Sequence, residues 1–222
     1  MVIAGDQTTA DRGIDLAFER LAQAPAESSG RPDETRPATV DEGLAAFADA
    51  NLVSVSVAGA FAPLIVKQAL LRDRHVFCFS DNVSLADEVA LKALAVDRGL
   101  LLMGPDCGTA LVDGTPLGFV NAVHPGPVGI VSASGTGAQE VMCLLDSRGV
   151  GVSQVIGVGG RDLSEDVEGA MTHAALSLLD ADDATACIVL IGKPPGRRVA
   201  DALFARLSEL ATPVVTCLRS EE

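Results

Sequence analysis

The chain has 222 residues, enough to bury a core, and 48% of them are hydrophobic while only 3% are aromatic. The core must therefore be built from Ala, Val, Leu and Ile, a composition usual for layered α/β folds. The formal net charge of -14 excludes a general nucleic-acid binder, because so acidic a chain repels polyanions.

The first 38 residues are set apart from the rest of the chain. Residues 1–23 are interpreted as the remnant of a preceding domain, with the end of a strand at 2–4 and helical spacing over 9–24. Residues 24–38 are rich in Pro, Ser and charge without periodicity, which indicates a linker. The chain starts with no basic region before an apolar run, and it has no segment of membrane-span length. We therefore expect a cytoplasmic protein without a membrane partner.

From residue 39 onward, apolar runs with helix and strand character alternate. In chain order the pattern predicts a helix over 40–48, a strand over 52–57, a helix over 63–71, a strand over 75–80, a helix over 84–99 and a strand over 100–104. A long turn-rich segment, 105–127, follows. After it come a strand over 128–134, a helix over 137–149, a strand over 153–158, a helix over 166–180, a strand over 186–192, a helix over 198–210 and a strand over 213–218.

This alternation predicts an α/β fold of two open parallel-sheet units, 39–125 and 126–222, with right-handed crossovers. The second unit ends directly after a strand that no helix follows. Because an open parallel sheet needs both faces covered, we expect a partner or a further segment there.

The segment "SASGTG" leaves one of the predicted strands and opens a helix with Ser134, Gly135, Thr136 and Gly137. A glycine turn leaves the first helical N–H groups unpaired, and the helix dipole adds positive potential, which favours a phosphate or carboxylate. The alternative is that Ser134 or Thr136 caps the helix and the glycines allow close packing. The motif alone does not separate the two readings, and no Gly-Lys-Ser/Thr follows as in a Walker loop.

The segment "GVGGRD" follows the next strand. Gly157, Gly159 and Gly160 permit close backbone approach, and Arg161 offers a bidentate donor for carboxylate or phosphate. Asp162 is a candidate for capping the next helix or for proton transfer. The structural alternative for Arg161 and Asp162 is a surface turn.

Basic residues follow the strand over 186–192. Lys193 stands at the strand end, and Arg197 and Arg198 start the next helix, where positive charge opposes the helix dipole. Anion binding would explain this placement, and for Arg198 a solvated basic face explains it nearly as well.

Further polar residues follow strands of the first unit. Asp81 and Asp106 are candidate site residues, and Asn82 is either a candidate site residue or, like Ser84, a cap for the following helix. Cys107 has no histidine near it in sequence, so a buried thiol is favoured over a nucleophile. The five cysteines and three histidines are dispersed without zinc-site or redox-motif spacing, and we predict no metal.

Several segments together resemble the FdrA family, a branch of the succinyl-CoA synthetase α-subunit superfamily. They are "FSDNVSLADEVALK", "LLLMGPDCGTALVDGTPLGFVNAV", "VGIVSASGTGAQEV", "GVGGRDLSEDVEG" and "LIGKPP", in matching order from about residue 50 to the end. The resemblance implies a partial Rossmann-like CoA-binding-type domain over 39–125 and a flavodoxin-like succinyl-CoA-synthetase-type domain over 126–222. It offers CoA as a cofactor, and it implies companion subunits in a hetero-oligomer and a small anionic substrate.

The FdrA family is connected with oxamate carbamoyltransferase in allantoin and purine catabolism, which converts oxalurate and phosphate to oxamate and carbamoyl phosphate. In the synthetases the turn that matches "SASGTG" faces a phosphohistidine and phosphate, which agrees with an anion at Ser134, Gly135 and Thr136. The chain departs from the pattern, because neither the phosphorylated histidine nor the glycine-rich CoA turn has a counterpart in it. We therefore interpret it as a short form, one half of a split protein, or a fragment.

Three functions are consistent with these features. The first is an FdrA-type subunit in which the N–H groups near Gly135 hold a phosphoryl group while Arg161 and Lys193 neutralise charge during carbamoyl or acyl transfer. The second is an ADP-forming acyl-CoA synthetase α-type subunit. The third is a non-catalytic scaffold for companion subunits.

Overall fold

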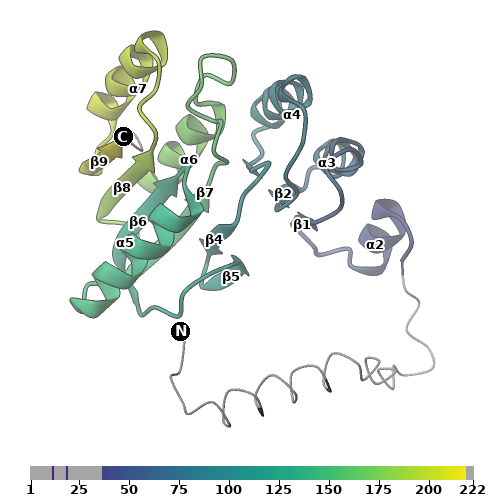
Figure 1. The fold of residues 1–222 in the computed structure, drawn as a ribbon, viewed down its shortest axis with the longest axis horizontal. Helices are drawn as coiled ribbons and strands as arrows, with labels where there is room; N and C mark the ends of the chain where they lie inside the picture. Colours follow the sequence, from purple (N-terminus) through teal and green to yellow (C-terminus); the bar gives the residue numbers. More distant parts are fainter. Residues whose placement is uncertain (1–11, 13–18, 20–36, 219–222) are drawn as a thin grey trace. The chain divides into compact units, whose positions relative to one another are not determined.

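The computed structural model describes Arg12, Glu19 and residues 37–218 (Figure 1). The chain divides into two units, Met1–Gly43 and Leu44–Glu222. The strand end predicted at 2–4 and, apart from Arg12 and Glu19, the helix predicted over 9–24 lie outside the described residues, as does most of the predicted linker. The helix predicted over 40–48 is confirmed as α2 (Val40–Ala46). Two side chains stabilise its start, since Thr39 Oγ1 accepts from Glu42 N–H and the Glu42 carboxylate accepts from Ala38 N–H.

The first sheet has three parallel strands in the order β1-β2-β3. The strands are β1 (Leu52–Val55), β2 (His75–Cys78) and β3 (Leu102–Met103), and the connecting helices are α3 (Ala62–Leu71) and α4 (Leu85–Asp97). All of these elements match predicted ones. Ser84, one of the two predicted caps for α4, is the N-cap and accepts a hydrogen bond from Asp87 N–H at 3.1 Å.

The second sheet has six strands in the order β5-β4-β7-β6-β8-β9. Its parallel strands are β6 (Pro125–Ser132), β7 (Val152–Gly157), β8 (Cys187–Gly192) and β9 (Val214–Leu218). The helices between them are α5 (Gly135–Ser147), α6 (Ala170–Asp180) and α7 (Arg197–Glu209). The predicted α/β fold with parallel sheets is confirmed.

Residues 105–127, which were predicted to form turns, contain a β-hairpin. β4 (Thr109–Val112) and β5 (Thr115–Gly118) pair antiparallel, and β4 also pairs antiparallel with β7, so the second sheet is mixed. The reading of 105–127 as turns alone was wrong. The cause is a two-residue loop, Asp113 and Gly114, in which both residues have positive φ (48° and 71°), as a type I′ hairpin turn requires.

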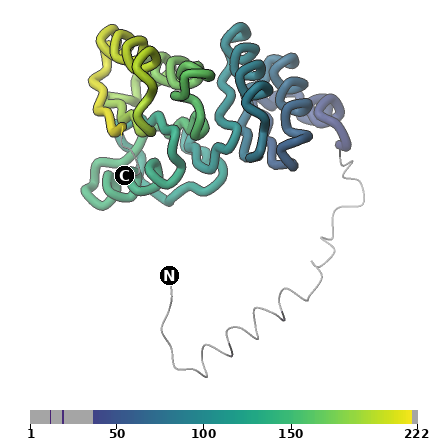
Figure 2. Tube along the Cα trace, turned by 45° about the horizontal axis from the view of Figure 1, so that its top comes forward, coloured from purple at the N-terminus to yellow at the C-terminus, as the bar shows by residue number. Residues whose placement is uncertain are grey.

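Two buried clusters lie on opposite faces of β6 in the second sheet. Ile130 belongs to the cluster that α5 covers with Ala138 and Met142. Its neighbour Val131 belongs to the cluster that α6 and α7 cover, and the latter cluster continues into the first sheet. The two sheets therefore share one core, and α4 and α6 lie side by side (Figure 2). The domain boundary at 125/126 stays a prediction.

Among the described helices, none is both long enough and apolar enough to cross a bilayer.

Candidate functional site

Two adjoining pockets lie at the carboxyl ends of the strands, where ligands collect in open α/β sheets. The narrow pocket encloses about 10 Å³ and is lined by residues 106–109, 132–135, 157 and 159. The wide pocket encloses about 470 Å³ and is lined by residues 56–58, 79–81, 106, 108 and 119. Asp106 and Gly108 line both. The narrow pocket has room for about one water-sized atom.

The amino end of α5 forms one wall of the narrow pocket. Ser134 is its N-cap, and its Oγ accepts a hydrogen bond from Gly137 N–H at 3.2 Å. Within the described part of the chain, the N–H groups of Gly135 and Thr136 have no hydrogen-bond acceptor. Ser134 therefore caps the helix, as the structural alternative predicted, and two N–H donors still face outward at an exposed helix start.

The glycines after β7 bring two turns into backbone contact. A Cβ on Gly157 would collide with Cys107 Sγ, and Gly159, with φ 86°, has the Pro105 carbonyl oxygen 2.5 Å from where its Cβ would be. A Cβ on Gly160 would meet its nearest neighbour, the Ala133 carbonyl oxygen, at an ordinary 3.8 Å. Gly157 and Gly159 therefore leave no room for a side chain against neighbouring protein atoms, whereas Gly160 does. The approach of an anion to the backbone of these glycines stays a prediction.

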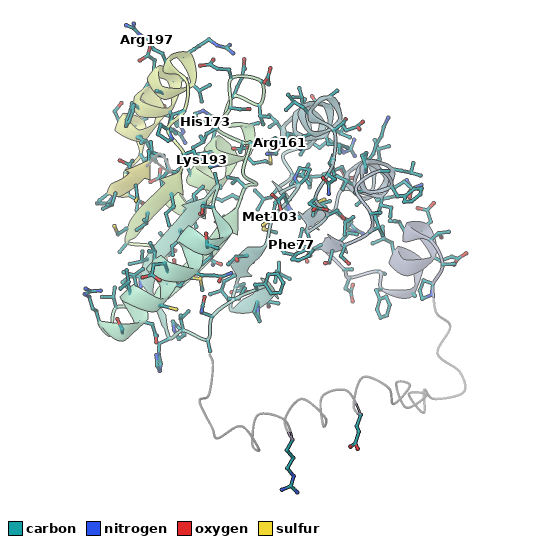
Figure 3. The ribbon with its side chains drawn as sticks, in the orientation of Figure 1. Phe77, Met103, Arg161, His173, Lys193 and Arg197 are labelled. Carbon is teal, nitrogen blue, oxygen red and sulfur yellow. The ribbon has the colours of Figure 1, made fainter. Side chains whose placement is uncertain are left out.

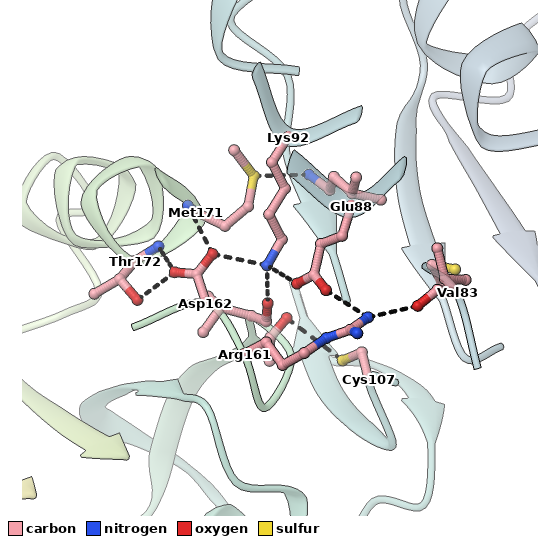
Figure 4. A network of polar contacts seen from close by, with 12 residues as sticks. Val83, Glu88, Lys92, Cys107, Arg161, Asp162, Met171 and Thr172 are labelled. Atoms are coloured by element: carbon pink, nitrogen blue, oxygen red, sulfur yellow. Dashed lines mark hydrogen bonds and ion pairs between the residues drawn. The ribbon is translucent and has the colours of Figure 1, made fainter. Parts of the chain in front are cut away.

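Arg161 is directed towards the loop before α4. Its Nη2 donates to the Val83 carbonyl at 2.8 Å and forms an ion pair with Glu88 Oε2 at 2.7 Å, while the side chain is 45% exposed (Figures 3 and 4). Arg161 lines neither pocket. Its role toward an anion therefore stays a proposal.

Asp162 is fully buried and accepts hydrogen bonds from the start of α6. Thr172 N–H and Thr172 Oγ1 donate to it at 2.8 and 2.7 Å, and Met171 N–H donates at 3.2 Å. Lys92 Nζ donates to the same carboxylate at 2.8 Å. Of the two roles considered for Asp162, these contacts match the helix cap.

Sequence reasoning missed Glu88 and Lys92, which form a buried ion pair at 2.8 Å within α4. Their spacing of four residues was visible, but such pairs usually lie on solvated helix faces.

The basic residues after β8 lie on the surface. Lys193 is exposed at the end of β8 (Figure 3). Arg198 forms ion pairs with Glu165 at 3.3 Å and Glu168 at 2.6 Å, and the hydrogen bond to Glu168 is the main reason that the pKa of Arg198 is raised. Arg198 is therefore a surface residue paired with two carboxylates.

Asp81 and Asp106 are exposed and line the wide pocket. Phe79 and Phe119 also line it, and their rings pack edge to face with centroids 5.4 Å apart. Asn82 is exposed and has a positive φ of 53°.

Cys107 is the buried thiol that the sequence favoured. Its Sγ donates to the carbonyls of Gly157 and Thr109 at 3.4 and 3.6 Å. Burial raises the pKa of Cys107 to about 12, so the thiolate needed for nucleophilic attack is not formed near neutral pH.

The described part of the first sheet does not fit the phosphates of CoA. No Lys, Arg or His lines the wide or narrow pocket, while Asp81 and Asp106 do. The first turn of α3 contains Pro63, which lacks an N–H, and the first turn of α4 carries Asp87 and Glu88. The amino ends of α3 and α4 are therefore poor binding sites for a phosphate. The residues described include no group of three His, Cys, Asp or Glu side chains placed to hold a metal ion.

A further cavity of about 260 Å³ lies at the opposite edge of the strands, lined by His75, Gln154 and Leu179 among others. None of the predicted site residues lines it, so we do not place the candidate site there.

Comparison with curated proteins gives clear relatives, although no protein-family model matches the chain. The uncharacterized protein YahF of Escherichia coli is 45% identical over 98% of this chain and 42% of its own length. Subunit alpha 2 of an ADP-forming succinate–CoA ligase from Archaeoglobus fulgidus is 33% identical over 76% of this chain and 58% of its own length. The chain thus spans about half the length of these relatives.

Two solved structures share the fold. ATP citrate lyase from Methanothrix soehngenii, in complex with citrate and coenzyme A, matches 82% of this chain and 31% of its own with a TM-score of 0.69 and 17% identity. The dinucleotide-forming acetyl-coenzyme A synthetase 1 of Ca. Korarchaeum cryptofilum matches 76% of this chain and 38% of its own, with a TM-score of 0.60 and 17% identity. At this identity the likeness shows the fold alone.

Proposed function

We propose, from the premise that the chain is homologous to the α subunits of succinate–CoA ligases, that it is an FdrA-type subunit handling an acyl or carbamoyl phosphate and a small carboxylate. We assign it to an oxamate carbamoyltransferase that acts with companion subunits. The observation that carries the assignment is the start of α5, where the N–H groups of Gly135 and Thr136 are available. Gly135 lines the narrow pocket, which shares Asp106 and Gly108 with the wide pocket of about 470 Å³.

The reaction suits a site that positions and neutralises charge. A phosphate oxygen attacks the carbamoyl carbon of oxalurate, the C–N bond to the oxamate nitrogen breaks, and the proton of hydrogen phosphate ends on that nitrogen. Charge develops on the phosphate and carbamoyl oxygens. The two N–H groups of α5 hold the phosphate, and Lys193 and Arg161 supply positive charge from the ends of β8 and β7.

CoA takes no part in this proposal, because the described part of the first sheet does not fit its phosphates. The alternative, an ADP-forming acyl-CoA synthetase α-type subunit, is favoured by the 33% identity to a succinate–CoA ligase subunit. Binding of CoA by the whole chain would support that alternative.

The test removes one N–H donor without disturbing the helix. Gly135 is the first residue of α5, where proline is tolerated, and Ser134 before it is extended (φ −139°, ψ 111°), as a residue before proline must be. A Cβ on Gly135 would meet its nearest neighbour at 3.6 Å. Gly135→Pro thus deletes the donor, and the matched control Gly135→Ala keeps it.

The measurement is calorimetric titration of the chain, alone and with its companion subunits, using phosphate, carbamoyl phosphate, oxamate and CoA separately. Gly135→Pro is expected to weaken carbamoyl phosphate binding roughly tenfold, because one hydrogen bond to a charged group is lost. Gly135→Ala is expected to bind as the unmodified chain does. Lys193→Ala and Arg161→Ala test, in the same titrations, whether these two positive charges contribute to anion binding. Silence toward every ligand in every assembly would instead favour a scaffold.

A further inference from the structure

The ammonium of Lys92 is buried and has three acceptors from two parts of the fold (Figure 4). Its Nζ donates to Glu88 Oε1 at 2.8 Å within α4, to the Val158 carbonyl at 2.9 Å and to Asp162 Oδ1 at 2.8 Å. All three N–H groups are therefore used.

Two of these acceptors bracket the turn after β7. Val158 precedes Gly159 and Gly160, and Asp162 follows Arg161, so one side chain from α4 holds both ends of the turn. Gly159 lines the narrow pocket and lies against the Pro105 carbonyl oxygen. The position of Lys92 is thus transmitted to a wall of the pocket by two hydrogen bonds.

The network is balanced in charge. Glu88 accepts from Lys92 with one oxygen and pairs with Arg161 through the other, so two cations meet two buried carboxylates. Removing one member alone would leave an uncompensated buried charge, whereas a buried ion pair can often be replaced as a pair at little cost in stability. Stability alone therefore gives no reason to bury Lys92 here.

We propose that Lys92 is a positioning residue for the narrow pocket: it fixes the turn over residues 158–162 so that the α5 N–H groups face a pocket of fixed width. The proposal rests on the proposed function, because it assumes that an anion binds at the start of α5. Lys92 acts through Val158 and Asp162 and touches no ligand itself.

The test replaces Lys92 and its partner Asp162 in one double variant. Lys92→Met with Asp162→Asn removes both hydrogen bonds to the turn, keeps the Glu88–Arg161 pair and leaves a side-chain oxygen that accepts from Thr172. The matched control, Lys67→Met with Asp97→Asn, makes the same charge change at exposed positions of α3 and α4. The readouts are calorimetric affinity for inorganic phosphate, hydrogen exchange of the Gly159 and Gly160 amides, and the melting temperature.

The expected result is a folded variant whose phosphate affinity falls roughly tenfold, as after loss of a hydrogen bond to a charged group, with faster exchange at Gly159 and Gly160. The control keeps both properties. Unchanged affinity in the folded variant, or an equal loss in the control, would overturn the positioning role. An unmodified chain that binds no phosphate, either alone or with its companion subunits, would overturn the proposed function and this proposal with it.

A second variant keeps the test decisive if the first does not fold. Lys92→Arg retains the charge, but a planar guanidinium does not reproduce the geometry of a compact ammonium with three acceptors. Weaker phosphate binding by folded Lys92→Arg supports the proposal, and affinity equal to that of the unmodified chain contradicts it.

Discussion

The backbone of Gly157 lies against the side chain of Cys107, whose Sγ donates a hydrogen bond to the Gly157 carbonyl at 3.4 Å. A Cβ on Gly157 would collide with that sulfur and would lie 2.5 Å from the Thr109 carbonyl oxygen. The end of β7 and the segment after β3 thus meet without room for a side chain. This contact closes one side of the narrow pocket.

Gly157→Ala is therefore expected to lower the free energy of unfolding by about 1–3 kcal/mol, the usual cost of overpacking a filled site. Urea denaturation measures the change. Gly160→Ala is the control, because its Cβ would meet the Ala133 carbonyl oxygen at an ordinary 3.8 Å. An equal free energy of unfolding for the two variants would show that the structure around Gly157 accommodates a methyl group without loss of stability.

Four of the five thiols are expected to separate into two reactivity classes. Burial raises the pKa of Cys78 to about 11 and of Cys107 to about 12, while Cys143 and Cys217 are exposed. Because the thiolate is the reactive form, an aromatic disulfide reagent at mildly alkaline pH should modify Cys143 and Cys217 in the folded chain. Cys78 and Cys107 should react only after addition of urea. Mass spectrometry of peptides locates the label, and rapid labelling of Cys107 in the folded chain would contradict its buried placement.

Much of the fold could be predicted because local patterns determine it. The apolar runs that became β1, β2 and β6 lie within a few residues of their predicted bounds, and the parallel sheets followed from the helices between them. Ser84 and Ser134 were recognisable as caps because a hydroxyl before a helix satisfies an N–H close in sequence.

The candidate site was less predictable because its contacts join distant segments. Lys92 and Asp162 are 70 residues apart, and Glu88, which holds Arg161, looks like half of an ordinary surface pair. The position of Arg161 after a glycine turn suggests an anion donor, but it does not reveal that the buried carboxylate of Glu88 pairs with one of its amino groups. The hairpin is hard to predict because Asp113 and Gly114, its two-residue loop, lie in a segment that contains many other turn residues.

The turn of that hairpin gives a local test. Gly114 has φ 71° and no atom within 4 Å of where a Cβ would lie, so a substitution there meets only backbone strain. Gly114→Ala should lower the free energy of unfolding by about 1 kcal/mol, the cost of a left-handed conformation without glycine. Asp113→Asn, which suits the same conformation, should have little effect. Thermal unfolding compares the two, and an unchanged melting temperature in Gly114→Ala would contradict the type I′ turn.

Stability should also fall as the pH is lowered through the range where histidine is protonated. Burial lowers the pKa of His75, and its Nδ1 accepts a hydrogen bond from Leu101 N–H at 3.0 Å, so the folded chain favours the neutral ring. In the unfolded chain the imidazole ring takes up a proton near its ordinary pKa of about 6.5. The contribution of His75 is therefore complete above that pH and is lost as the pH falls toward the lowered pKa of the folded chain.

His75→Asn should make this loss shallower, because the amide oxygen can accept from Leu101 N–H and does not titrate. Urea denaturation at about pH 7.5 and about pH 5.5 measures the difference. Part of the slope should remain, since burial also lowers the pKa of His173. His124→Asn is the control at an exposed position and should keep the His75-dependent loss. A His75→Asn chain that loses stability as steeply as the unmodified one would show that the ring at this position is not held neutral by the fold.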